Sequence, residues 1–199
     1  MSVLVSKQAP DFAANAVFGN NEIKELKLSD YRGQYVVLFF YPLDFTFVCP
    51  SELIAFDHRL AEFQARNVQV IGVSIDSQFT HLAWKNTPIE KGGIGQVGYP
   101  LVADVKHEIC QAYDVEFGAA GVAFRGSFLI DKEGVVQHQV VNNLPLGRNV
   151  DEMLRMVDAL QFVEENGEVC PAGWNKGKAG MKPTPEGVAA YLAANAPAL

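Results

Sequence analysis

Two uninterrupted apolar runs, separated by one amphipathic segment, most strongly constrain how this chain can fold. QYVVLFFYP at residues 34–42 and VQVIGVSID at residues 68–76 are typical of strands buried on both faces. Residues 50–65 lie between them and repeat apolar side chains at helical spacing, on a face formed by Leu53, Phe56, Leu60 and Phe63. A strand, a helix and a strand in this order predict a βαβ unit with a parallel pair of strands.

Further β-rich and helical segments widen this unit into a mixed sheet. FAANAVF and EIKELKL flank a Gly-Asn-Asn turn, and FRGSFLID and GVVQHQVVN flank Lys-Glu-Gly, so each pair predicts a hairpin. We also expect a short strand at 99–105 and helices at 78–86, 106–115 and 149–166, the last with an apolar stripe of Val150, Leu154, Val157 and Leu160 or Gln161. The predicted fold is α/β and thioredoxin-like, with a mixed central sheet flanked by helices.

The composition changes after residue 166. GEVCPAGWNKGKAGMKPTPEG is dense in Gly, Pro and Lys and shows no periodicity, and GVAAYLAAN near the end favours a short helix. This pattern predicts two parts: a domain over residues 1–166 and an extended C-terminal arm over residues 167–199 that has no core of its own.

Charge and composition exclude several classes of partner and site. The chain has 199 residues and a formal net charge of -7, and it contains no basic run, so nucleic acid and anionic membranes are not expected partners. The N-terminus lacks a secretory signal and no apolar run reaches transmembrane length, so we expect a cytoplasmic protein. Three scattered Cys indicate that any disulfide is transient or catalytic rather than structural.

The segment FYPLDFTFVCPSEL places a single thiol at the start of the first predicted helix. Pro50 suits the first helical position, so Cys49 lies at or beside the N-cap, where the helix dipole favours a thiolate. Such a thiolate is nucleophilic at neutral pH. The alternative is that Cys49 is a small buried apolar residue. Thr46 can hydrogen-bond an oxygen substrate placed over the sulfur, or can simply shape the loop.

The remaining candidate groups carry less specific signals. Glu52 stands where a thioredoxin-type oxidoreductase has its second Cys, so no local disulfide can close, and a first-turn Glu also complements the helix dipole. Cys170 in EVCPAGW is expected to be exposed and mobile, which suits a thiol that travels, although an incidental surface Cys is the alternative. We interpret Cys110 as a packing residue. The His residues form no triad or zinc pattern, and His107 beside Cys110 does not make a metal site.

FYPLDFTFVCPSEL and GEVCPAGW together closely resemble the typical 2-Cys peroxiredoxins, among them bacterial alkyl hydroperoxide reductase C and the thioredoxin peroxidases. The resemblance extends over essentially the whole chain, from QAPDF to the arm, and Pro42, Thr46 and Cys49 match the family's Pro-x-x-x-Thr-x-x-Cys signature. It implies that Cys49 is the peroxidatic Cys, that Thr46 hydrogen-bonds the peroxide and that Pro42 shields the pocket. Arg125 matches the family's active-site Arg, which stabilises the thiolate and the leaving oxygen, and Cys170 matches the resolving Cys of a neighbouring subunit.

The resemblance also implies the reaction cycle and the partners. Hydrogen peroxide or an organic hydroperoxide would oxidise Cys49 to a sulfenic acid, an intersubunit disulfide would follow, and thioredoxin or a flavoprotein disulfide reductase would reduce it. No metal, haem or flavin is required. Homodimers formed through edge strands would assemble into a decamer. GGIG at residues 92–95 and Tyr191-Leu192 differ slightly from the family's Gly-Gly-Leu-Gly and Tyr-Phe, which predicts intermediate sensitivity to overoxidation.

Two other functions fit the same residues. The protein could act mainly as a peroxide-driven redox relay, or as a chaperone-like holdase that binds unfolded chains when overoxidised. A thioredoxin-like disulfide reductase is disfavoured because the chain has no Cys-x-x-Cys. Turnover with excess reductant distinguishes a peroxidase from a relay, which would instead form mixed disulfides with its partners.

Overall fold

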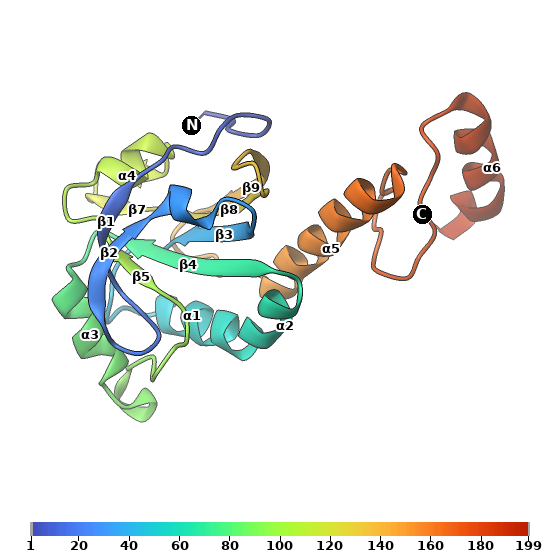
Figure 1. Ribbon diagram of the computed structural model, residues 1–199. Helices are drawn as coiled ribbons and strands as arrows, with labels where there is room; N and C mark the ends of the chain where they lie inside the picture. Colours follow the sequence, from blue (N-terminus) through green and yellow to red (C-terminus); the bar gives the residue numbers. More distant parts are fainter. Residues whose placement is uncertain (1, 199) are drawn as a thin grey trace. The chain divides into compact units, whose positions relative to one another are not determined.

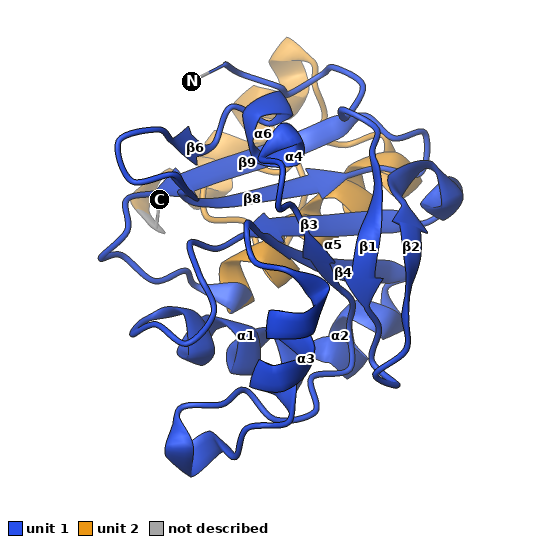
Figure 2. Cartoon of the chain, turned by 90° about the vertical axis from the view of Figure 1, so that its left-hand side faces the viewer, with its two compact units in different colours: residues 1–150 blue, residues 151–199 orange. Residues whose placement is uncertain are grey.

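The computed structural model describes residues 2–198, which form two compact units (Figure 2). The first unit extends to residue 150, and the second begins at residue 151, within the first turn of helix α5 (Val150–Asn166). The amphipathic helix therefore groups with the C-terminal segment rather than with the sheet domain. The functional division at residue 166 stays a prediction.

The N-terminal unit is built on a seven-stranded mixed sheet with the strand order β2-β1-β5-β4-β3-β8-β9 (Figure 1). Strands β3 and β4 pair in parallel, as the βαβ pattern predicts, and β5 adds to β4 in parallel. Both predicted hairpins are confirmed as antiparallel pairs, β1 with β2 and β8 with β9. The strands are β1 (Ala13–Val17), β2 (Ile23–Lys27), β3 (Tyr35–Phe40), β4 (Val68–Ser74), β5 (Leu101–Ala103), β8 (Arg125–Ile130) and β9 (Val136–Asn142).

A second, two-stranded sheet was not predicted from the sequence. It pairs β6 (Glu116–Phe117) with β7 (Val122–Ala123). Its strands have only two residues each, which is too short for any hydrophobic period to show.

The predicted helices form, with one correction. Residues 50–65 were expected to be one helix, but Arg59 leaves helical geometry at φ -106° and ψ 5° and separates α1 from α2. Neither Pro nor Gly stands at the break, so the sequence carries no local signal for it, and Leu60 beyond it is only half-buried. The helices of the first unit are α1 (Cys49–His58), α2 (Leu60–Ala65), α3 (Gln78–Lys85), α4 (Glu108–Ala112) and the short 3-10 turns η1 (Leu28–Tyr31) and η2 (Ile89–Lys91).

Helices cover both faces of the central sheet, with α1, α2 and α3 on one side and α4 on the other (Figure 2). Alternate residues of β3 point to opposite faces, which explains why the whole strand is apolar. Phe39 stacks on Phe56 of α1, with ring centroids 4.2 Å apart. Phe40 points the other way, toward Tyr113 at the end of α4, with centroids 5.2 Å apart.

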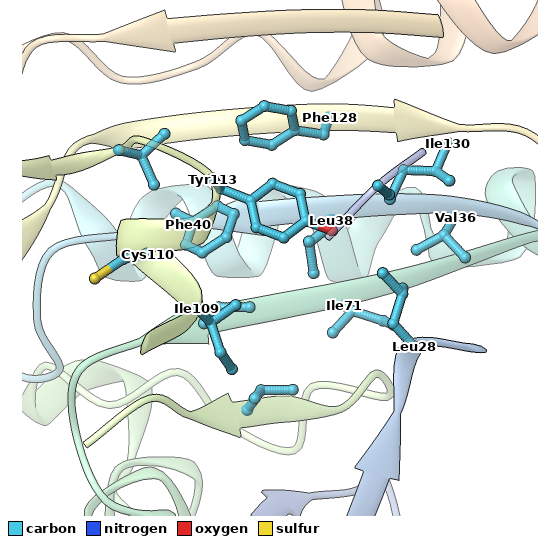
Figure 3. Packing of buried hydrophobic residues seen from close by; sticks show 14 of the residues in the cluster. Leu28, Val36, Leu38, Phe40, Ile71, Ile109, Cys110, Tyr113, Phe128 and Ile130 are labelled. Atoms are coloured by element: carbon cyan, nitrogen blue, oxygen red, sulfur yellow. The ribbon is translucent and has the colours of Figure 1, made fainter. Parts of the chain in front are cut away.

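Cys110 packs in the core on the α4 side (Figure 3). Its side chain lies in the cluster that includes Phe40, Tyr113 and Phe128, and its Sγ donates to the carbonyl oxygen of His107 at 3.3 Å. Burial, reinforced by the nearby Asp104 carboxylate, raises the pKa of the Cys110 thiol to about 12. A thiol that stays protonated in the core is not a nucleophile, so the packing interpretation of Cys110 is confirmed.

The C-terminal unit combines α5 with the segment that follows it. It contains α5, a bridge between Val169 and Met181, α6 (Pro185–Asn195) and the 3-10 turn η3 (Ala196–Ala198). Trp174 is buried, and its ring lies 4.8 Å from that of Phe162 on α5. The short helix expected near the end is α6. Thr184 is its N-cap, and the Thr184 side chain accepts from the backbone N–H of Gly187.

Across residues 2–198, every helix is too short or too polar to span a lipid bilayer.

Candidate active site

Cys49 is the first residue of α1 and follows the loop that leaves β3. Cys49 was expected at or beside the N-cap and Pro50 in the first helical position. The structure has Val48 at the N-cap, so Cys49 and Pro50 occupy the first two positions. The partial positive charge of a helix N-terminus favours a thiolate there. Cys49 is fully buried, which a small packing residue would also be, so its polar neighbours have to decide between the two interpretations.

Thr46 is one such neighbour. Its Oγ1 lies 3.0 Å from Cys49 Sγ and 2.8 Å from the carbonyl oxygen of Leu43. A hydroxyl has one proton and two acceptor lone pairs. Thr46 can therefore donate a hydrogen bond to Leu43 while it accepts one from the thiol or from a peroxide, or it can donate to a thiolate. The structure brings Thr46 to the sulfur, as its spacing of three residues suggested.

Arg125 is the second neighbour, and it comes from a distant part of the chain. It is the first residue of β8, and because β8 runs antiparallel to β3, it lies beside the end of β3, where the loop to Cys49 begins. Its Nη1 donates to Cys49 Sγ at 3.3 Å, and its Nε donates to the carbonyl oxygen of Leu144 at 2.7 Å. A guanidinium at this distance stabilises a thiolate and any negative charge that develops on a nearby oxygen.

Glu52 and Arg148 complete the cluster. Glu52 Oε2 accepts from Arg125 Nη1 at 2.6 Å, and both Glu52 oxygens accept from the Arg148 guanidinium, at 2.8 and 2.9 Å. Arg148 also donates to the carbonyl oxygens of Phe40 and Gly126. Burial lowers the pKa of Arg148, and Glu52 partly offsets that effect. Glu52 is thus the buried counter-ion of two arginines rather than only a residue that complements the helix dipole.

The charged side chains around Cys49 carry an excess of one positive charge. Arg125 and Arg148 carry two positive charges, Glu52 carries one negative charge, and all three side chains are at least nine-tenths buried. An uncompensated buried charge is costly. Cys49 Sγ accepts from Arg125 at 3.3 Å within this positively charged cluster, and such surroundings are typical of a nucleophilic thiol rather than of a packing residue.

The loop between β3 and Cys49 is anchored by a buried polar network. Asp44 accepts from Tyr41 Oη at 2.8 Å and pairs with Nδ1 of His81 on α3 at 2.8 Å. The backbone N–H of Asp44 donates to Asp76 at 2.8 Å. His81 was expected to be an ordinary surface or core residue, and it is fully buried. Pro42 is buried at the beginning of the same loop.

Cys170 lies in the C-terminal unit, where it is half-buried rather than exposed. Its Sγ donates to the carbonyl oxygen of Ala159 on α5 at 3.6 Å. Desolvation raises the pKa of the Cys170 thiol, and the positive charge of Arg155 opposes that shift. The expected exposure of Cys170 is therefore corrected to a half-buried position, with its segment docked on α5, and its mobility stays a prediction.

One group of side chains has the composition of a metal site. Nδ1 or Nε2 of His107, Sγ of Cys110 and a Glu116 oxygen all lie within 4.8 Å of one another, and the sequence pattern missed the contribution of Glu116. His107 Nδ1 is already hydrogen-bonded to Glu116 at 2.7 Å. A metal would also need the Cys110 thiolate, which the raised pKa of about 12 disfavours. Metal binding here would have to displace the Cys110 thiol proton and break the His107–Glu116 hydrogen bond.

Comparisons with known proteins agree with this geometry. The AhpC/TSA family model matches residues 5–139, and the model for the C-terminal domain of 1-Cys peroxiredoxin matches residues 159–194. Alkyl hydroperoxide reductase C of Helicobacter pylori is 62% identical over 97% of this chain and 98% of its own length. A chloroplastic 2-Cys peroxiredoxin of Hordeum vulgare is 55% identical over 96% of this chain and 91% of its own.

A solved structure extends the similarity to the whole fold. Reduced 2-Cys peroxiredoxin of Plasmodium vivax matches with a TM-score of 0.94 and 53% identity, over 96% of this chain and 100% of its own. The relatives are peroxidases that reduce peroxides with a thiol, and the buried Cys49 cluster has the groups that such chemistry needs. The chain belongs to the AhpC/TSA family and is a 2-Cys peroxiredoxin, an enzyme of thiol-dependent peroxide reduction.

Proposed function

We propose that Cys49 is the peroxidatic cysteine, that Thr46, Arg125 and Pro42 form its peroxide site, and that Cys170 is the resolving cysteine. The observation that carries the proposal is that Thr46 Oγ1 and Arg125 Nη1 both reach the Cys49 sulfur, at 3.0 and 3.3 Å. Hydrogen peroxide and organic hydroperoxides are the proposed substrates.

In the first half-reaction the Cys49 thiolate attacks one oxygen of the peroxide. The S–O bond forms as the O–O bond breaks, and the departing oxygen leaves as water or an alcohol after taking a proton. Arg125 donates to the oxygens as negative charge moves onto them, and Thr46 holds the peroxide in line with the sulfur. Glu52 and Arg148 keep the Arg125 guanidinium directed at the sulfur.

In the second half-reaction Cys170 of a neighbouring subunit attacks the sulfenic acid, which yields an intersubunit disulfide and water. Glu52 explains why the partner thiol comes from elsewhere, because a counter-ion of two arginines occupies the position of a local second Cys. Thioredoxin or a flavoprotein disulfide reductase then reduces the disulfide. The three free cysteines suit a reducing compartment, the cytosol.

The proposed assembly is a homodimer that forms a decamer. Strand β9 is at one edge of the sheet, where it can pair with the same strand of a second copy. Phe47 on the catalytic loop and Phe79 on α3 are large apolar side chains with exposed fractions of 98% and 68%. Contact with another dimer would remove such surface from water.

The test is to add one equivalent of hydrogen peroxide to the reduced protein and to follow it on a non-reducing gel with peptide mapping. A dimer band linked through Cys49 and Cys170 is expected. Cys49→Ser should abolish the band, and Cys110→Ser should leave it intact. A monomer that carries oxidised Cys49 without any linkage would remove Cys170 from the cycle and point to an external thiol.

A further inference from the structure

The segment that carries Cys170 lies along one face of α5. Cys170 Sγ donates to the carbonyl oxygen of Ala159 at 3.6 Å, and Arg155 Nη1 donates to the carbonyl oxygen of Trp174 at 2.8 Å. Arg155 and Ala159 are four residues apart, so they occupy the same face of the helix. Phe162, one turn further on, contacts the Trp174 ring. The segment 170–174 is therefore held at both ends, and the Arg155 guanidinium provides one of these three contacts.

Arg155 binds the segment that carries Cys170, through the carbonyl oxygen of Trp174 at 2.8 Å, and its positive charge lowers the pKa of the Cys170 thiol. Glu152, on the same helix, binds the Arg155 guanidinium at 2.6 and 2.7 Å and orients it. Asp158 on α5 is paired with Lys176 at 3.2 Å, and Glu168 precedes Cys170 in its own segment. Desolvation raises the pKa of Cys170, and Arg155 lowers it. The thiol thus rests protonated against Ala159 with one cation placed to stabilise its ionised form.

We propose that Arg155 is a positioning residue of the resolving half-reaction, which holds the Cys170 segment on α5 and stabilises the Cys170 thiolate that attacks the sulfenic acid. This rests on the proposed roles of Cys49 and Cys170. Cys170 first gives its proton to solvent. As the S–S bond forms, the S–O bond of the sulfenic acid breaks and hydroxide leaves, which takes up a proton to become water. The Cys49 sulfur is reduced and the Cys170 sulfur is oxidised, so no other oxidant or reductant is needed.

The first experiment measures the reactivity of Cys170 without peroxide. In a Cys49→Ser background, iodoacetamide labelling of Cys170 is followed from pH 6 to pH 10 by peptide mapping. Arg155→Met should move the midpoint of the pH profile upward and slow labelling near neutral pH by about two- to fivefold, the range for one charge at a partly exposed site. Arg155→Lys keeps the charge and should restore most of the profile.

Two features of the design separate charge from docking. Lys176→Met removes a positive charge that faces Asp158, and it should leave the profile unchanged. If Arg155 only tethers the segment, Arg155→Met exposes the Cys170 thiol. The labelling rate at high pH then rises, while the midpoint of the pH profile stays the same or falls. That result would overturn the proposal, as would an equal upward shift in Lys176→Met.

The second experiment follows the full-length enzyme after rapid mixing with peroxide. Arg155→Met should leave the oxidation of Cys49 unchanged and slow the formation of the Cys49–Cys170 disulfide several-fold, with the loss shrinking as the pH rises. A uniform loss at all pH values contradicts thiolate stabilisation. If wild-type protein forms no such disulfide, the proposed function fails, whereas the labelling experiment still reports on Arg155.

Discussion

Replacing Glu52 with Gln tests whether the buried counter-ion directs the chemistry at Cys49. Gln keeps the size of the side chain and removes the charge. In the native cluster Glu52 accepts from the guanidinium of Arg125, from the backbone N–H of Arg148 and from two nitrogens of the Arg148 guanidinium. The substitution leaves both guanidinium groups buried without that carboxylate and directs an amide N–H₂ toward one of them.

Two effects on the rate oppose each other, and their magnitudes decide the outcome. Extra positive charge favours the Cys49 thiolate, but the thiolate fraction cannot exceed one, so the gain is limited. The loss is larger, because Arg125 is released from its 2.6 Å contact and is no longer directed at the reacting oxygens. Removing one preorganised donor to a developing oxyanion costs about 10²-fold to 10³-fold. Breaking one side of a buried ion network also costs about 3–5 kcal/mol of stability.

The assay is the second-order rate constant for peroxide by stopped-flow fluorescence, with urea unfolding measured in parallel. Glu52→Gln should lose roughly 10²-fold in rate and stability in the stated range. Glu62→Gln is the matched control, because that Glu lies on α2, where its side chain is exposed, and it should change neither quantity. A rate within threefold of wild type, together with the full loss of stability, would refute the idea that Glu52 orients Arg125.

Four further predictions concern Thr46, Cys110, Leu192 and the first turn of α1. Thr46→Val, which removes the hydroxyl 3.0 Å from the sulfur, should lower the peroxide rate constant by about 10²-fold, and Thr46→Ser should recover most of it. Folding raises the pKa of the Cys110 thiol from 9.0 to about 12. Between these pH values the thiol ionises in the unfolded chain but not in the folded one, which stabilises the unfolded chain. Urea unfolding should therefore show that the wild type loses stability relative to Cys110→Ala as the pH rises from 9 toward 12. Leu192→Phe, which restores the family's aromatic pair, should increase inactivation by millimolar-range peroxide, scored as sulfinic acid at Cys49; retained activity through many turnovers would oppose this. Hydrogen exchange at residues 46–52 should be faster in the disulfide form than in the reduced form, since the first turn of α1 must loosen, and equal protection would contradict it.

The order of the helices and strands could be predicted from the sequence because each has its own local pattern of apolar residues. The two apolar runs became neighbouring parallel strands, and both hairpins formed around their Gly-containing turns. The break at Arg59 could not be predicted, since no breaker residue marks it. The docking of the Cys170 segment also left no signal, because Gly- and Pro-rich composition does not reveal that Trp174 finds a partner on α5.

The active site divides in the same way. Cys49 and Thr46 could be named as candidates from the sequence, because Thr46 precedes Cys49 by three residues and Pro50 marks the start of a helix. Arg125 required the family resemblance, because its approach to the sulfur depends on the antiparallel pairing of β8 with β3, across 76 residues of sequence. Arg148 was not predicted. It lies in a loop without a sequence pattern, and its partner Glu52 is 96 residues away in the chain.

The Asp44 anchor sets how far the sulfur can travel. Asp44 is fixed to His81, Tyr41 and Asp76 from three directions, and Cys49 follows it by five residues. A chain extends at most ~3.3–3.6 Å per residue, so even a completely unwound first turn carries the Cys49 backbone no more than about 18 Å from the anchor. The position of Asp44 therefore limits how far the Cys49 sulfur can move. In the proposed cycle, any longer distance to the Cys170 sulfur of a neighbouring subunit has to be covered by the segment that carries this thiol, which must first leave α5.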